Sequence, residues 1–393
     1  MATLSKFGKN NFKSVLLIIY LVSFMLVQFS LNIGFSFKPY MFISAIIILV
    51  SLVSNKTKSM VIYRKMLIYE VFMVTFVIYA TIRNFFAGDI LLGFKGSIAL
   101  CFSLFVYYFT FYSFKGIKNE RIFRFIYKCG IIILLIIAAG YILKDNRIFE
   151  LDRSVNRLRG YIQDPNFFAL YFVLPMIVFL FYSIREKKNW LITLISVFAI
   201  FLTYSRAAYL SLILGIIYLL FLLRDDIPKF YRKILISVFV IIIGLWVFSS
   251  LDITEQIWNT ALQNIMARFS ETASRNAREL LIKIGIETFK ENPIFGIGML
   301  NVRYYTYSLV HNNYLHNTYL EVFVEQGMIG GFLYLGFILS FILTKCNNIH
   351  SKIIKAVIVC QLMMIFFLTA VNNEALFLSM GLFRAINFKD ELK

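Results

Sequence analysis

Long apolar runs separated by short polar segments dominate the chain and predict a bundle of membrane-spanning helices. Each run is close to the roughly 20 residues that cross a bilayer as a helix. The stretch 190–223 holds two of them, because Arg206 interrupts an apolar run with basic residues at both flanks, so two short helices should meet in a turn there. About twelve spans are expected, near residues 14–33, 39–54, 64–82, 90–113, 124–143, 166–184, 190–205, 207–223, 234–250, 318–343, 354–371 and 374–388. The fold class expected is an all-α polytopic membrane protein.

One long polar interval, residues 251–317, separates the ninth span from the tenth. It predicts two amphipathic helices, over about 254–269 and 276–291, and Pro293 ends the second. One stripe of the second helix holds Ala277, Leu280, Leu281, Ile284, Thr288 and Phe289, and the other face carries Glu279, Lys283 and Glu287. The chain therefore divides into transmembrane helices 1–9 (1–250), a large loop (251–317), and transmembrane helices 10–12 with a tail (318–393).

Composition supports the bilayer as the solvent for most of the chain. Of the 393 residues, 60% are hydrophobic and 43 are Phe, which is more apolar surface than a soluble domain can bury. More than half of the 40 Lys and Arg residues lie in short segments at alternate ends of the spans. The positive-inside rule places those segments and both termini in the cytoplasm. The first helix has no small-residue cleavage site and should stay attached, and the cysteines lie where no disulfide is expected.

The remaining cations concentrate on the predicted outer side, in residues 144–165 and 251–317. Long translocated loops often ignore the positive-inside bias, which would explain this without any function. An outward-facing cationic surface also suits an anionic ligand. Its position at the membrane surface favours a lipid-linked phosphate.

Two short patterns on the outer side stand at helix starts. Asp164-Pro165-Asn166 suits a turn into a helix, because Asp can cap the helix and Pro is tolerated in its first turn. A simple cap would explain that pattern alone. Arg206 stands one helical turn before Leu210, and an arginine between hydrophobic helices is costly unless it is paired or functional.

Two further patterns flank the end of the large loop. Arg278 lies on the second amphipathic helix, where a solvated face would also explain it. His316 and Asn317 stand where the polar loop enters a long apolar helix. On an ideal helix Gly327 and Gly330 would lie about 20° and about 40° from the His316 direction, so a further membrane helix could approach there.

Together these patterns resemble the membrane O-antigen ligase and polymerase family, whose members join sugar chains carried on polyprenyl pyrophosphate lipids. His-Asn, nine residues, Gly, two residues and Gly are matched from His316 to Gly330. Arg, three residues and Leu are matched from Arg206 to Leu210. Arg278 precedes an N-P-x-x-G-x-G segment at 292–298, as in the family. The resemblance covers residues 155–335.

The resemblance implies inverting transfer of a glycan from undecaprenyl pyrophosphate to an acceptor hydroxyl. Arg206 and Arg278 would stabilise the leaving pyrophosphate, since guanidinium groups bind phosphate in a bidentate manner. His316 would be the general base. His311 is the other histidine on this side, and the family spacing favours His316 over it. This scheme requires no metal, nucleotide or other cofactor, in agreement with the lack of a P-loop pattern or of metal-ligand spacing.

Other polar residues on the outer side are candidates for binding the substrate. Lys95 and Arg159 could touch phosphate, although side chains that snorkel to the interface would explain both equally. The full set of substrate-binding candidates is Lys95, Arg159, Asp164, Asn166, Arg303 and Asn317.

The leading function is a polymerase that joins lipid-linked repeat units into a surface polysaccharide of O-antigen or capsule type, at the bacterial cytoplasmic membrane. A ligase that moves the glycan to a lipid core or a protein is the near alternative. A transporter of the same lipid is the alternative from another class, but it should place charge near the bilayer midplane in two related halves. The expected partners are the lipid-linked oligosaccharide, membrane lipids and, as a candidate, a chain-length regulator, but no nucleic acid.

Overall fold

The computed structural model describes residues 2–32, 36–53, 66–152, 155–224, 272–310 and 314–388. The ninth predicted span (234–250), the first predicted amphipathic helix (254–269) and His311 lie outside these residues. Each of the other predicted spans overlaps a helix, and so does the second amphipathic segment. The helix over the first predicted span, 14–33, ends earlier than predicted, at Ser23.

The described helices account for nearly all of the regular structure. The sequence did not predict the short helix α12 or two antiparallel hairpins. The hairpins pair β1 (Leu31–Asn32) with β2 (Ser36–Phe37), and β3 (Phe149–Asp152) with β4 (Val155–Leu158). The helices are α1 (Ala2–Ser23), α2 (Pro39–Val53), α3 (Ile68–Arg83), α4 (Ile90–Phe114), α5 (Asn119–Ile142), α6 (Pro165–Glu186), α7 (Trp190–Phe201), α8 (Arg206–Leu223), α11 (Thr272–Glu291), α12 (Val302–Val310), α13 (Thr318–Leu343), α14 (Ile349–Ile365) and α15 (Glu374–Asn387), with 3₁₀ turns η1 (Val27–Phe29) and η2 (Asn84–Phe86).

Six of the described helices are long and apolar enough to cross a membrane. They are α3 with its 3₁₀ extension, α4, α5, α6, α8 and α13. Shorter apolar helices lie at Phe12–Ser23, Pro39–Ser51 and Trp190–Phe201. The chain is therefore a polytopic membrane protein.

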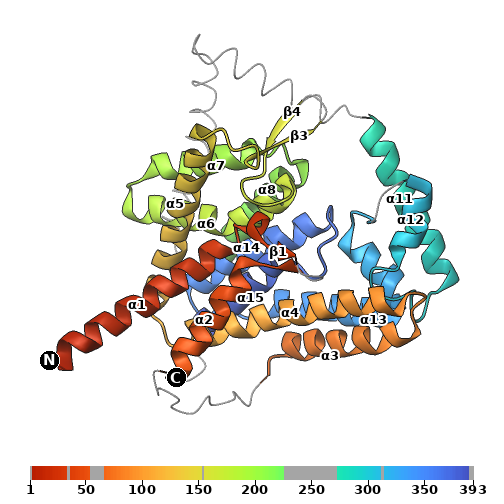
Figure 1. The fold of residues 1–393 in the computed structure, drawn as a ribbon, viewed down its shortest axis with the longest axis horizontal. Coiled ribbons are helices and arrows are strands. Elements are labelled where there is room, and N and C mark those ends of the chain that lie inside the picture. The colour runs from red at the N-terminus through yellow and green to blue at the C-terminus, as the bar shows by residue number, and fades with distance from the viewer. Residues whose placement is uncertain are drawn as a thin grey trace, which may run out of the picture.

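Helix α6 forms the centre of the bundle, because it is apolar on every side and almost wholly buried. It packs against α5, α7 and α14. Helices α3, α4 and α13 run side by side, and α11 and α12 lie against one end of this group (Figure 1). The end of the bundle that carries the start of α13 also carries the starts of α6 and α8, which brings the sequence patterns together.

The turn predicted at Arg206 is confirmed. Helix α7 ends at Phe201 and α8 begins at Arg206, with a short turn between them. The Ser205 hydroxyl caps α8 by accepting the backbone N–H of Ala208 at 3.2 Å. Arg206 thus stands in the first turn of α8.

Helix α13 departs from the ideal helix that the glycine spacing assumed. Gly327 has φ 64° and ψ −168°, which breaks the helix there. A Cβ at Gly327 would lie 2.2 Å from the carbonyl oxygen of Ile294, so the loop Pro293–Gly298, and not another helix, approaches this glycine. Gly330, in contrast, does meet a neighbouring helix, because a Cβ there would lie 3.0 Å from the ring of Tyr79 in α3.

Backbone hydrogen bonds join this loop to the break in α13. Gly298 donates to the carbonyl of Glu325 at 2.7 Å, and Met328 donates to that of Pro293 at 2.8 Å. Arg83, at the end of α3, holds the loop from the other side by donating to the carbonyls of Phe295 (2.9 Å) and Gly296. Backbone groups freed by the break are thereby paired, as a membrane helix requires.

Candidate functional site

A small apolar cluster fixes the segment that contains His316. Leu315 packs with Leu281 of α11, Val302 of α12 and Val324 of α13, together with Ile297 of the Pro293–Gly298 loop. The predicted stripe of α11 is confirmed at Leu281, Ile284 and Thr288, which are buried, whereas Leu280 is 43% exposed. Because Arg278 precedes Leu281 by three residues, about one helical turn, the same packing brings this arginine toward His316.

His316 lies just before α13 in the left-handed backbone region, with φ 53°. Asn317 caps α13 by accepting the backbone N–H of Leu320 at 3.1 Å. Burial lowers the pKa of His316, the positive charge of Arg278 lowers it further, and the negative charge of Asp164 acts in the opposite direction. His316, Arg278 and Asp164 therefore share one electrostatic environment, in which the imidazole is neutral at neutral pH and able to accept a proton.

Asp164 starts α6 as the sequence predicts. Its carboxylate accepts the backbone N–H groups of Asn166 at 2.7 Å and Phe167 at 3.2 Å. The cap therefore holds the Asp164 carboxylate in place, and the negative charge of that carboxylate still acts on His316. A structural role and an electrostatic one coexist in this residue.

Arg157, which the sequence analysis did not single out, ties this turn to the turn that carries Arg206. Its side chain is 4% exposed. It donates to the Thr203 carbonyl at 2.9 Å and to the Asn166 side-chain oxygen at 3.2 Å. Because Thr203 and Arg206 belong to the same α7–α8 turn, Arg157 holds the starts of α6 and α8 at a fixed separation. In the sequence, Arg157 is one of several cations of the predicted outer loop 144–165, and nothing there marks it as buried.

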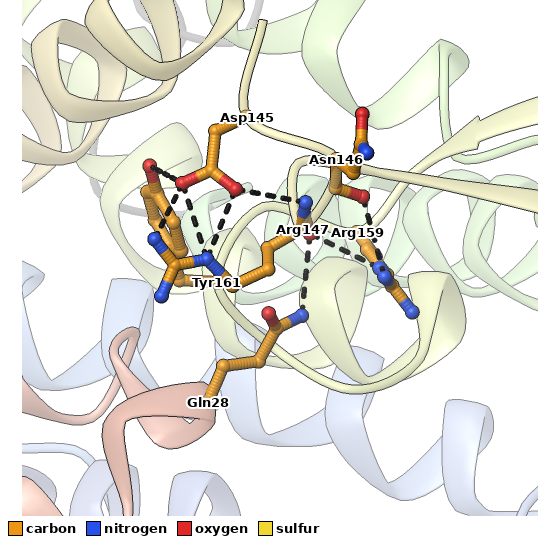
Figure 2. Close-up of polar contacts among 6 residues, drawn as sticks. All are labelled: Gln28, Asp145, Asn146, Arg147, Arg159 and Tyr161. Atoms are coloured by element: carbon orange, nitrogen blue, oxygen red, sulfur yellow. Dashed lines mark hydrogen bonds and ion pairs between the residues drawn. The ribbon is translucent and has the colours of Figure 1, made fainter. Parts of the chain in front are cut away.

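Arg159 points to a different network, on the surface of the same end of the bundle. It donates to the backbone carbonyls of Arg147 at 3.0 Å and Asn146 at 3.4 Å. Figure 2 shows it next to Asn146 and the backbone of Arg147, while the carboxylate of Asp145 accepts from the Arg147 guanidinium and from Tyr161. The hydrogen bonds from Arg147 lower the pKa of Asp145. Arg159 is thus not brought to His316 by any of these contacts.

Lys95 is exposed on α4, close to Asp89. A hydrogen bond from Tyr304 lowers the pKa of Asp89, and the charge of Lys95 contributes in the same direction. These contacts connect Lys95 to the start of α4 and to α12, and not to His316. Its role toward phosphate stays a prediction.

Arg303 of α12 faces two carboxylates that the sequence analysis left unassigned. Glu321 and Glu325 are 1% and 3% exposed, one helical turn apart on α13, and Arg303 acts electrostatically on both. The guanidinium also donates to the Tyr314 hydroxyl at 2.9 Å and stacks over its ring at 5.0 Å. Two acidic residues four apart in an apolar span are costly unless they are paired or functional. This spacing in the sequence could have identified Glu321 and Glu325 as candidates.

Glu321 connects the His316 segment to the turn between α14 and α15. Its carboxylate accepts the backbone N–H of Leu315 at 3.4 Å and the hydroxyl of Thr369. Thr318 reinforces this connection, because its hydroxyl accepts the backbone N–H of Ala370 at 2.9 Å. The residues before and after His316 are therefore both anchored to that turn.

The arrangement offers a neutral proton acceptor with an arginine in its field, but no site of metal-binding composition. Within the described ranges no three His, Cys, Asp or Glu side chains come together in a way that could hold a metal ion. A nucleophilic hydroxyl brought to His316 could lose its proton to the ring, while Arg278 would favour an anionic group nearby.

Comparison with known proteins finds a family similarity in the central part of the chain. Residues 191–335 match the family model described as O-Antigen ligase. This range includes Arg206, Arg278 and His316, and it ends just after Gly330. A search of curated proteins found no match to the chain. Residues 191–335 are accordingly similar to the O-antigen ligase family, whose members are glycan-transferring enzymes.

Proposed function

We propose that this protein is a polymerase that joins undecaprenyl-pyrophosphate-linked repeat units into a surface polysaccharide, on the outer face of the bacterial cytoplasmic membrane. One observation carries the proposal. His316, whose pKa is lowered by burial, shares its electrostatic environment with Arg278 and Asp164, and the two residues His316 and Arg278 lie inside the range that matches a glycan-transferring family. General base and phosphate-binding cation are the two functions that this transfer needs.

The chemistry follows from those two groups. An acceptor hydroxyl attacks the anomeric carbon of the donor sugar, and its proton passes to a ring nitrogen of His316. The bond from the anomeric carbon to the pyrophosphate oxygen breaks, and its electron pair leaves with the lipid pyrophosphate. Attack opposite the leaving group inverts the anomeric centre.

Arg206 and Arg278 act on the leaving group in this scheme. Negative charge develops on the pyrophosphate near a low-dielectric boundary, where fixed positive charges stabilise it by several kcal/mol. The Arg157 tie supports a role for Arg206, because it holds the start of α8 against the α6 turn that carries Asp164.

A ligase is the second candidate, because the matching family model is described as O-Antigen ligase. The two functions share the donor and the chemistry, and they differ in the acceptor. A transporter fits less well, because it should place charged groups near the bilayer midplane in two related halves, and the sequence shows no such pair of related halves.

Deletion of the gene in its native host tests the proposal, with the surface glycan analysed on gels. A polymerase deletion should abolish the ladder of long chains and leave a single repeat unit on the final acceptor. Loss of all attached repeats, with lipid-linked polymer accumulating, would instead establish the ligase. An unchanged glycan pattern would contradict both.

A further inference from the structure

A polar cavity of about 180 Å³ lies beside the site just described. It opens between η1, the residue before α2, the start of α6 and the turn that joins α14 to α15. Its polar wall includes Lys38, Gln163, Asn372 and Glu374, and the aromatic ring of Tyr171 lies in the same lining. No step of the mechanism above uses these side chains.

Two sets of contacts place this cavity next to His316. Thr369 lines the cavity and donates its hydroxyl to Glu321, which also accepts the backbone N–H of Leu315. On the other side, Gln163 lines the cavity and is followed by Asp164, whose charge acts on His316. The cavity therefore adjoins the His316 segment through both the α14–α15 turn and the α6 turn.

The charges in the cavity suit an uncharged ligand that is rich in hydroxyl groups. The carboxylate of Glu374 pairs with Lys38 and accepts hydrogen bonds from the hydroxyls of Tyr40 at 3.0 Å and Tyr171 at 2.9 Å. This pairing cancels the two formal charges, so the cavity lacks the excess positive charge that a pyrophosphate requires. What remains for a ligand is chiefly amide groups, which donate and accept hydrogen bonds, beside aromatic surface.

The volume restricts the ligand to a small group. It is below the roughly 300–1,000 Å³ of pockets that enclose a drug-sized ligand. A single sugar ring fits this size, whereas a chain of repeat units would extend out of the cavity.

We infer that this cavity binds the terminal sugar of the acceptor glycan and presents its attacking hydroxyl to His316. The inference rests on the proposed function and adds the acceptor subsite to it. The reacting atoms are those given above: the acceptor oxygen bonds to the anomeric carbon, its proton goes to His316, and the pyrophosphate leaves with the electron pair. The cationic side of the site is left for the donor.

Variants of two lining amides test the subsite in the intact protein. Gln163 is exposed and Asn372 is half-buried, so neither replacement removes a core side chain. Gln163→Leu and Asn372→Leu should each raise the KM for the lipid-linked acceptor about tenfold, by loss of one polar contact. The kcat at saturating acceptor and the KM for the donor should not change. Asn146→Leu, an exposed amide at the same end of the bundle but outside the cavity, is the matched control and should behave as the unmodified protein.

A binding measurement separates this inference from the proposed function. The probe is the free repeat-unit oligosaccharide released from the host's own polysaccharide, detected by saturation-transfer NMR on the full protein in detergent. Binding that is weakened about tenfold in Gln163→Leu and Asn372→Leu, but not in Asn146→Leu, supports the sugar subsite even if the protein transfers no glycan. Equal binding in all variants, no binding by the unmodified protein, or a rise in the donor KM in place of the acceptor KM would each overturn the inference.

Discussion

At the residue scale, the candidate site depends on how the surroundings of His316 set its protonation. The imidazole is partly buried beside Arg278, and both effects disfavour the charged ring. Asp164 counteracts them from the start of α6. The histidine is therefore tuned by residues from two other parts of the chain, neither of which is near it in sequence.

His316→Ala should reduce glycan transfer by roughly 10²–10⁴-fold, the usual contribution of a general base. Expression and membrane insertion should be unchanged, since the side chain is not part of the apolar cluster around Leu315. His316→Gln can hydrogen-bond but cannot take a proton at neutral pH. Retention of most activity by His316→Gln would reduce His316 to a positioning role. His311→Ala, assayed in parallel as the control, should lose far less.

Asp164→Asn should change the pH dependence of transfer. Asn retains the capping oxygen, so α6 keeps its N-terminal hydrogen bonds. Removal of the negative charge removes the influence that raises the pKa of His316, so the ring stays neutral to lower pH. The acidic limb of the kcat/KM profile should therefore move to lower pH. Asp145→Asn removes a carboxylate from the neighbouring network and serves as the control; a limb that moves equally in both variants would contradict the assignment.

Arg278→Ala should abolish product formation while the protein still inserts, because the leaving pyrophosphate loses a fixed cation. Lys283→Ala removes an exposed cation from the same helix and should have little effect. Arg206→Lys should also be severely impaired, since an ammonium group cannot reproduce the bidentate geometry of guanidinium. Radiolabelled glycan transfer in proteoliposomes measures all three. Near-normal turnover in Arg278→Ala would mean that Arg278 only belongs to a solvated helix face and does not bind the pyrophosphate.

At the element scale, the loop Pro293–Gly298 and the break in α13 form one structural unit. Each provides backbone groups to the other, and glycines on both sides permit the close approach. Gly296 and Gly327 both have positive φ, and a Cβ on either would meet the backbone of the other segment within 2.6 Å. The family spacing of these glycines thus reflects a loop-to-helix contact.

Gly327→Ala should destabilise the protein strongly. It adds the strain of a left-handed conformation and a clash at 2.2 Å with the Ile294 carbonyl oxygen. Gly116→Ala is a matched control, because Gly116 has φ 83° but a Cβ there would meet nothing within 4 Å. Gly116→Ala should cost about 1 kcal/mol from strain alone, with activity retained. Thermal unfolding in detergent compares the two variants, and equal shifts in Tm would show that the loop Pro293–Gly298 does not contact Gly327 closely.

The sequence predicted the helices of the site well, and their contacts only in part. The turn at Arg206, the cap at Asp164 and the buried stripe of α11 follow from local patterns, so sequence alone could locate them. Arg157 and Glu321 were missed because their roles depend on partners distant in sequence, at Thr203 and at Thr369. The helical projection from His316 to Gly327 was wrong because a straight helix was assumed across a residue that breaks it.

At the scale of the whole molecule, the arrangement concentrates chemistry at one end of the bundle. The starts of α6, α8 and α13 and the packed helix α11 meet there, around a centre formed by the buried helix α6. The described basic segments 115–128, 185–188 and 345–355 lie at the start of α5, the end of α6 and the start of α14, where Arg185 and His350 both contact Glu120. The proposed outward orientation follows from that asymmetry.

Cysteine labelling tests the orientation. In a variant that lacks the native cysteines, Asn146→Cys should react with an impermeant maleimide in intact cells or, where an outer membrane blocks the reagent, in spheroplasts. Lys187→Cys, also exposed but at a basic segment, should react only after the membrane is opened. Labelling of position 187 alone in intact cells would reverse the topology and place His316 in the cytoplasm.

The paired break in α13 also has a consequence for how the protein is made. An unpaired backbone group in lipid costs several kcal/mol, so α13 enters a bilayer readily only if its partners at Gly327 are already available. Those partners, residues 293–298, are synthesised about thirty residues earlier and would reach the translocation machinery first. We expect a fragment that begins before Pro293 to insert α13 more efficiently than one that begins after Gly298, as glycosylation mapping in microsomes would measure. On this account the loop acts as a built-in insertion aid for the helix that follows it.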